Sequence, residues 1–312
     1  LWGTNIVSTH VHMVPFVEEA KKRGAKIICI DPRETRTAAL SDWHIQPKPG
    51  TDAALALGIM NEIVINRKHD LAFLKKHTTG YKEFLDKILP KYTLDKVSRV
   101  TGIKKADIKQ LAFEYGSTKK TYIRPNYGLN RHRNGGMMVR SIMLLPAITG
   151  AWRNKSSGCF VGSIEEMWNV DLGKLQRPDL LDNKNPRSIN MIQIGNALND
   201  KKLDPPIKSL FVWNSDIANC APDSISVRKG LKRKDLFTVV HETFWTDSCD
   251  YADIVLPADT QLEHMDLHAP YGHYYFSLTQ PAIKPLGESK SNQDLYRALA
   301  KYMGYKDKCF KE

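Results

Sequence analysis

Short apolar, β-branched runs alternate with amphipathic helical segments along most of this sequence. The clearest example is a helix from about Pro15 to Arg23, stopped by Gly24 and followed by the strand-like run Ala25–Ile30 and the terminator Asp31-Pro32. A short apolar run of this kind is typical of a parallel strand that is buried on both faces. Because parallel strands need crossover connections, the alternation predicts an α/β fold with mostly parallel sheets and flanking helices.

The alternation continues to the end of the chain. Leu1-Trp2 reads as the end of a strand, and further strands are expected at Thr121–Asn126, Leu210–Trp213, Leu236–Val240 and Ile254–Leu256. Further helices are expected from Thr51 or Asp52 onward and at Lys105–Tyr115, Gly136–Thr149, Pro222–Leu231 and Asn292–Met303. We predict two Rossmann-like dinucleotide-binding units, residues 1–118 and 119–312, with a loop-rich segment at about 152–202 in the second.

Composition narrows the class of protein. The chain is 42% hydrophobic and 26% charged, which is typical of a soluble globular protein and excludes disordered and fibrous classes. It has no run of 18 apolar residues, so we expect no membrane contact from this segment. The net charge of +12 is spread along the chain without interleaved aromatic residues. That distribution argues against nucleic-acid binding and favours a basic surface that attracts anionic ligands.

Metal-binding patterns are weak in this sequence. Its five cysteines are widely spaced and form no C-x-x-C pair, so local ligands for a zinc ribbon or an iron–sulfur cluster are lacking. His264 and His268 are spaced like a helical metal pair, but no third ligand accompanies them, and we predict no metal site. The chain begins with Leu1 instead of Met, and we expect it to be an internal segment of a longer protein. Localisation, cytoplasmic or exported to the periplasm, is therefore not predicted.

Polar residues follow the predicted strands, where ligands bind in open parallel sheets. Gly3 permits close approach to a phosphate, with Thr4 and Asn5 as donors, and Asp31 is placed to accept from ribose hydroxyls. Asp52, at a helix N-terminus, can accept from N1 and N2 of a guanine. Each also has a structural interpretation as a turn, a strand terminator or a helix cap. Their joint occurrence favours a dinucleotide site, although only one of the three glycines of G-x-G-x-x-G is present.

These residues belong to blocks that resemble the molybdopterin oxidoreductases of the dimethyl-sulfoxide-reductase family. The blocks are GTN at 3–5, GAKIICIDPRETRTA at 24–38, KPGTDAALALG at 48–58, YGLNRH at 127–132, WNS at 213–215, TDS at 246–248, ADIVLP at 252–257 and PLGE at 285–288. They occur in family order over nearly the whole chain. Two positions depart from the pattern: Asp216 stands where proline is common, and Asn292 stands where an acidic residue is often found.

The resemblance implies two molybdopterin guanine dinucleotides around one molybdenum or tungsten atom. The implied contacts to one dinucleotide are Trp2, Gly3, Thr4, Asn5, Asp31, Pro32, Arg33, Gly50, Thr51 and Asp52, with Asp52 on the guanine. Tyr127, Gly128 and Arg131 would approach a pterin, with Arg131 or His132 as a tuning or structural residue. The implied contacts to the other dinucleotide are Asn214, Ser215, His241, Glu242, His264 and Asn292.

The family also implies parts that this chain does not carry. A domain with a 4Fe-4S cluster and the metal-ligating side chain would precede Leu1, and a further cofactor-clamping domain would follow Glu312. The intact enzyme would transfer an oxygen atom or a hydride equivalent to or from a small substrate and exchange electrons with a redox partner or subunit. This segment alone would be inactive. Two alternatives are a non-catalytic paralogue that is a structural subunit of an electron-transfer complex, and a plain nucleotide-binding module.

Overall fold

The computed structural model describes residues 1–162, 171, 178–181, 185–268 and 275–310. The chain divides into two compact units, Leu1–Gly162 and Ser163–Glu312, which are described separately. The boundary therefore lies after Gly162, whereas the sequence alternation suggested a boundary after residue 118. The reason is packing, because helix α9 (Gly135–Thr149) lies against helix α4 (Asp52–Ile65), which belongs to the first unit.

The first unit is built on a parallel sheet. Strand β1 (Ile28–Ile30) pairs with β2 (Trp43–Ile45), and β3 (Tyr122–Ile123) pairs with β4 (Gly158–Cys159), both in parallel. Trp2 joins the two pairs, because it forms parallel bridges to Ile30 on one side and Pro125 on the other. The order across the sheet is β2, β1, Trp2, β3, β4. The predicted strand end at Leu1-Trp2 thus occupies the central position.

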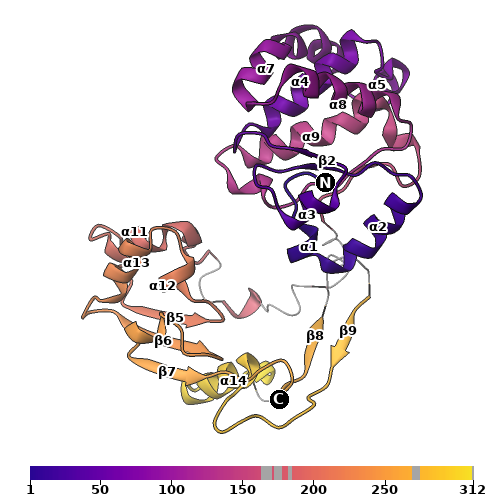
Figure 1. The fold of residues 1–312 in the computed structure, drawn as a ribbon. Coiled ribbons are helices and arrows are strands. Elements are labelled where there is room, and N and C mark those ends of the chain that lie inside the picture. Colours follow the sequence, from indigo (N-terminus) through magenta and orange to yellow (C-terminus); the bar gives the residue numbers. More distant parts are fainter. Residues whose placement is uncertain (163–170, 172–177, 182–184, 269–274, 311–312) are drawn as a thin grey trace. The chain divides into compact units, whose positions relative to one another are not determined.

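Helices cover both faces of this sheet (Figure 1). One layer holds α1 (Ile6–Thr9), α2 (Val14–Lys22) and α3 (Arg36–Leu40). The other holds α4, α5 (Leu71–His77), α7 (Leu94–Thr101), α8 (Lys105–Ser117) and α9. Shorter helical segments are Val11–Met13, α6 (Tyr81–Glu83), the π-helix Phe84–Ile88, and the 3-10 turns Leu89–Lys91, Leu129–Arg131 and Ala151–Arg153.

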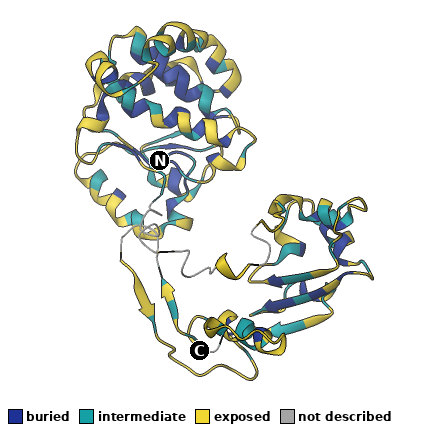
Figure 2. Ribbon diagram, turned by 180° about the vertical axis from the view of Figure 1, so that it is seen from behind, coloured by how far each residue is buried: buried dark blue, intermediate teal, exposed yellow. Residues whose placement is uncertain are grey.

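Helix α4 is the centre of the larger core. It is apolar on nearly all sides, as expected of a helix packed between neighbours, and Leu55, Ile59, Met60 and Ile63 are fully or almost fully buried. Figure 2 shows the buried residues of this unit concentrated between its helices. Helix α8 passes the predicted stop at Gly116 and ends at Ser117. Gly116 lies inside the helix because α8 approaches α4 closely there: a Cβ at this position would lie 3.2 Å from Ile63.

The second unit contains a smaller parallel sheet. Strands β5 (Ser209–Trp213), β6 (Phe237–Glu242) and β7 (Ile254–Pro257) lie side by side in that order. Its core forms where α11 (Ile194–Asn199), α12 (Ile217–Cys220) and α13 (Ser224–Leu231) pack together. Helix α14 (Asn292–Tyr302) follows, after an antiparallel ribbon of β8 (Asp266–His268) and β9 (Ser277–Thr279) that the sequence did not predict.

The predicted α/β class with parallel sheets and flanking helices is confirmed. Much of the segment at 152–202 that was predicted to be loop-rich lies outside the described residues. Its described parts include β4, α11 and the 3-10 turns Pro178–Leu180 and Met191–Gln193. A further 3-10 turn is Cys249–Tyr251 and another is Lys308–Phe310. Within the described residues, every helix is too short or too polar to cross a membrane.

Candidate functional site

The turn after Trp2 is fixed from both sides at the C-terminal edge of the first sheet. The Gly3 amide donates to the Ile30 carbonyl at 2.9 Å, and the Asn126 amide donates to the Trp2 carbonyl at 3.2 Å. Gly3 has φ +60°, a conformation that glycine adopts without strain. The residues that follow β1 and β3 are therefore held beside this turn.

Gly3 and Gly128 meet at that edge. A Cβ at Gly128 would lie 2.8 Å from the Gly3 carbonyl oxygen, and a Cβ at Gly3 would lie 2.8 Å from Cγ of the buried Leu129. A side chain at either position would displace the neighbouring segment. The structure thus brings the predicted first turn and the predicted pterin-facing turn into direct contact.

Thr4 and Asn5 have partners within the unit. Thr4 is 2% exposed, and its hydroxyl accepts from the Asn126 side-chain amide at 3.3 Å. Asn5 Oδ1 accepts from the Thr37 hydroxyl at 2.8 Å, which leaves its amide nitrogen as the donor for a ligand. Asn126 and Thr37 were not among the predicted site residues. Their positions, at a predicted strand end and inside the GAKIICIDPRETRTA block, were the available signals.

Asp31, Pro32 and Arg33 follow β1 on the open surface. Asp31 Oδ1 accepts from the Arg33 amide at 2.9 Å, which closes a turn, and the Asp31 carbonyl accepts from His44 Nε2 at 2.9 Å. Pro32 and Arg33 are exposed, so the guanidinium is accessible to an anionic ligand.

The Gly50-Thr51-Asp52 segment begins α4. Gly50 has φ +79°, and the Thr51 hydroxyl donates to the Lys48 carbonyl at 2.7 Å. Asp52 is only 5% exposed, and its Oδ1 accepts from the indole Nε1–H of Trp2 at 2.8 Å. Burial raises the pKa of the Asp52 carboxyl, and the Trp2 hydrogen bond opposes that rise. The residue predicted for guanine recognition is therefore tied to the predicted phosphate turn.

The three residues predicted to approach a pterin are accessible. Tyr127, Gly128 and Arg131 are all exposed, and they follow β3 in the turn that leads into α9. The neighbouring His132 ring lies beside Gly50, with Nδ1 3.6 Å from the position of a Cβ there. Four segments far apart in sequence thus converge at one edge of the first unit.

In the second unit, Asn214 and Ser215 follow β5, and His241 and Glu242 are the last two residues of β6. Asn214 has φ +51°, and its amide donates to the His241 carbonyl at 3.3 Å; it and Ser215 are exposed. Glu242 Oε1 accepts from the Thr243 amide at 2.9 Å. These residues lie at the C-terminal ends of paired strands, as predicted.

The remaining contacts of the second unit gather around the Lys290 carbonyl. His241 is 1% exposed, with Nδ1 3.1 Å from Asn292 Oδ1 and Nε2 3.2 Å from that carbonyl oxygen. The Asp259 amide donates to the same oxygen at 3.2 Å, and Asp259 Oδ1 accepts from His264 Nδ1 at 2.9 Å. His241 therefore has a supporting position, whereas His264 is partly accessible. Asp259 was missed, although it lies two residues after the ADIVLP block.

The described residues hold no group of three or more His, Cys, Asp or Glu side chains placed to bind a metal. The spacing of His264 and His268 does not correspond to one helix face, because His264 lies in a bend and His268 is in β8.

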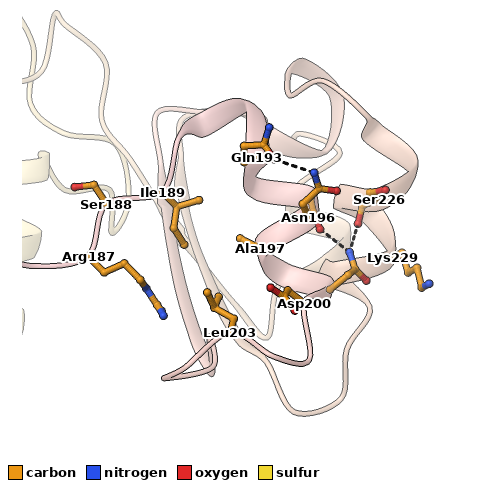
Figure 3. A pocket seen from close by; sticks show the side chains of 12 residues that line it. Arg187, Ser188, Ile189, Gln193, Asn196, Ala197, Asp200, Leu203, Ser226 and Lys229 are labelled. Carbon is orange, nitrogen blue, oxygen red and sulfur yellow. Dashed lines mark hydrogen bonds between the residues drawn. The ribbon is translucent and has the colours of Figure 1, made fainter.

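Two pockets lie away from the predicted residues. One, of about 660 Å³, is lined in the second unit by residues that include Arg187, Gln193, Asn196, Asp200 and Lys229 (Figure 3). The other, of about 360 Å³, lies in the first unit beside α5 and α9. Neither is lined by a predicted site residue. The candidate site is instead an open edge of the sheet.

Comparisons with known proteins agree on one family. A family model described as molybdopterin oxidoreductase matches residues 1–302. The probable oxidoreductase YoaE of Bacillus subtilis (strain 168) is 46% identical over 100% of this chain and 45% of its own length. Dimethyl sulfoxide reductase DmsA of Escherichia coli (strain K12) is 31% identical over 97% of this chain and 42% of its own length.

The fold of this chain is also similar to that of a solved structure. Acetylene hydratase from Pelobacter acetylenicus superposes with a TM-score of 0.74 at 26% sequence identity, over 95% of this chain and 45% of that chain. The present chain therefore spans about half the length of the relatives that it matches.

Proposed function

Because this chain belongs to the molybdopterin oxidoreductase family, we propose that it forms the dinucleotide-binding core of a molybdenum or tungsten oxidoreductase. The observation that carries the proposal is the convergence of the Gly3 turn, Asp31, Asp52 and Gly128 at one sheet edge of the first unit. Parallel sheets bind dinucleotides at that edge.

The residues at this edge suit one half of a bis(molybdopterin guanine dinucleotide) cofactor. Asp52 offers carboxylate acceptors to a guanine, the side-chain amide nitrogen of Asn5 can donate to a diphosphate, and Arg33 and Arg131 are exposed cations. The space beside Gly50, next to the carboxylate proposed for the guanine base, holds only the His132 ring within 4 Å of the position of a Cβ. When bound, the pterin dithiolenes hold the metal that carries oxygen-atom or hydride-equivalent transfer.

Charge supports this assignment. Residues 1–162 carry 27 Lys and Arg against 13 Asp and Glu, a net charge of +14, whereas residues 163–312 carry 19 against 21, a net charge of −2. The excess positive charge of the whole chain thus belongs to the first unit. A field of that sign attracts the diphosphate of a dinucleotide.

In the second unit, Asn214, Ser215, Glu242 and His264 are the contacts proposed for the second dinucleotide. His241 contacts both the Asn292 side chain and the Lys290 carbonyl, and so holds the loop at Lys290 in place. The substrate is a small molecule and electrons pass to a redox partner or subunit. A 4Fe-4S cluster and the metal-ligating side chain would come from parts of the parent protein outside this chain.

The test is metal and nucleotide analysis of the protein purified from its natural source. We expect molybdenum or tungsten, and acid-released GMP in about twofold molar excess over the metal. A protein with neither metal nor guanine nucleotide would instead be a non-catalytic paralogue with a structural role. We expect the 312-residue chain expressed alone to hold little or no metal, because it spans less than half the length of its relatives YoaE and DmsA.

A further inference from the structure

The Trp2 indole and the Asp52 carboxylate form a buried pair that spans 50 positions of sequence. Trp2 is 3% exposed and Asp52 is 5% exposed. An indole has a single N–H donor and no acceptor, so it satisfies one lone pair of Oδ1. The backbone amide of Asp52 also donates to the carboxylate, and the remaining acceptor sites are available to a ligand.

The backbone of Trp2 cannot move independently of the sheet. Its amide donates to the Arg124 carbonyl at 2.9 Å, and its carbonyl accepts from the Asn126 amide at 3.2 Å. Its ring is part of the main core cluster of the unit, next to the Gly3 turn. Trp2 is therefore one rigid connection between the turn proposed for a diphosphate and the carboxylate proposed for a base.

We propose that Trp2 is a positioning residue that aims the Asp52 carboxylate at the N1 and N2 donors of a guanine. The proposal rests on the function proposed above. Guanine presents two parallel N–H donors on this edge, which match the two oxygens of a carboxylate held in one orientation. A carboxylate free to rotate loses much of this two-point match. Adenine presents an acceptor at N1, which the carboxylate repels.

The electrostatics of the pair agree with this role. Burial raises the pKa of Asp52, whereas the Trp2 N–H and the nearby His132 lower it. Base recognition needs the ionised carboxylate, so affinity for guanine is present above the pKa of Asp52 and is lost as the pH falls through it. Loss of the indole N–H removes a stabilising donor and moves this transition to higher pH.

The test compares Trp2→Phe with wild type by calorimetric titration of GMP, IMP, AMP and pyrophosphate into the 312-residue chain between pH 5 and 8. Phenylalanine keeps an aromatic ring but removes the N–H. We expect wild type to prefer GMP over IMP and AMP, and Trp2→Phe to bind GMP about 10-fold more weakly. Pyrophosphate affinity should be unchanged, and the loss of GMP affinity should occur at a higher pH than in wild type.

Trp43→Phe is the matched control, because Trp43 lies in the same sheet but its ring packs near Lys26 instead of a carboxylate. GMP affinity and its pH profile unchanged in Trp2→Phe would overturn the positioning role. A wild-type chain that binds GMP no better than AMP would overturn the proposed function instead, so the two failures are distinguishable.

A second measurement covers the case in which Trp2→Phe does not fold. The indole N–H resonance of Trp2 in the wild-type chain, followed by nitrogen-15 NMR, should shift with pH as Asp52 titrates and should move on addition of GMP but not of AMP. In Asp52→Asn the pH-dependent shift should vanish. An indole resonance that ignores both pH and GMP would overturn the proposal.

Discussion

Asp216 holds Ser248 at the turn where β5 leads into α12. Its Oδ1 accepts from the Ser248 hydroxyl at 2.7 Å and from the Ser248 amide at 3.1 Å, and Ser248 is 1% exposed. The Ser248 hydroxyl in turn accepts from the Ala218 amide at 3.1 Å. This position departs from the family pattern, in which proline is common, and the carboxylate has a structural task.

Asp216→Ala should destabilise the chain, because two donors of a buried serine lose their acceptor. We expect a cost of about 2 kcal/mol in the free energy of unfolding. Asp216→Asn keeps an oxygen at this position and should cost less than half as much. Chemical denaturation of both variants gives the comparison, and an Asp216→Ala variant as stable as wild type would contradict this account.

Gly3→Ala separates backbone strain from steric contact. Both Gly3 and Gly24 have positive φ, of +60° and +90°, but only Gly3 has atoms within reach of an added Cβ. Gly24→Ala should therefore cost about 1 kcal/mol of unfolding free energy from strain alone. Gly3→Ala should cost a further 1–3 kcal/mol or so, because Leu129 is buried and cannot yield freely.

Thermal or chemical denaturation of the two glycine variants is the measurement. Equal costs for Gly3→Ala and Gly24→Ala would mean that the contact with Leu129 relaxes without loss. In that event the close approach of the two turns would not constrain the site.

Local sequence pattern predicted the helices and strands of this fold well, but it did not predict which of them pack together. Asp52 and Asn292 begin helices as expected, because helix starts depend on a few neighbouring residues. Strand β2 was missed because Trp43–Ile45 is three residues long and includes His44, which leaves no readable period. The division after Gly162 could not be inferred from local pattern, because the packing of α9 on α4 joins residues far apart in sequence.

The same limit applies to the candidate site. The sequence predicted that the polar residues at the ends of the strands form the site, since parallel topology brings such ends to one edge of a sheet. The hydrogen bond between Trp2 and Asp52 could not be predicted, because nothing in the sequence spacing links an indole to a carboxylate 50 residues away. The supporting contacts of Asn126, Thr37 and Asp259 were missed for the same reason.

Removal of one exposed guanidinium at the candidate site should weaken anion binding. Arg33→Gln and Arg131→Gln should each lower the affinity for pyrophosphate about 3- to 10-fold at low salt, and less at high salt, because exposed charges are screened. Arg99→Gln is the control, since Arg99 is exposed on α7, outside the candidate site. Calorimetric titration at two salt concentrations measures the effect, and equal losses in all three variants would indicate only a general field.

The last prediction concerns Glu263 and pH. Its Oε2 accepts from the Thr260 amide and its Oε1 from the Leu286 amide, each at 2.7 Å. The bond from Thr260, above all, lowers the pKa of the Glu263 carboxyl below its usual value. A depressed pKa means that the stabilisation is fully present above the unfolded-state pKa, about 4.3, and is lost as the pH falls through the folded-state value.

Glu263→Gln should therefore unfold at lower denaturant concentration than wild type at pH 7, because the amide nitrogen of glutamine cannot accept a hydrogen bond. The difference between the two midpoints should shrink as the pH falls below about 4. Glu288→Gln, at an exposed position of the same segment, should leave the midpoint unchanged at both pH values. A gap between Glu263→Gln and wild type that stays constant with pH would show that the carboxylate charge is not what secures the Thr260 and Leu286 backbones.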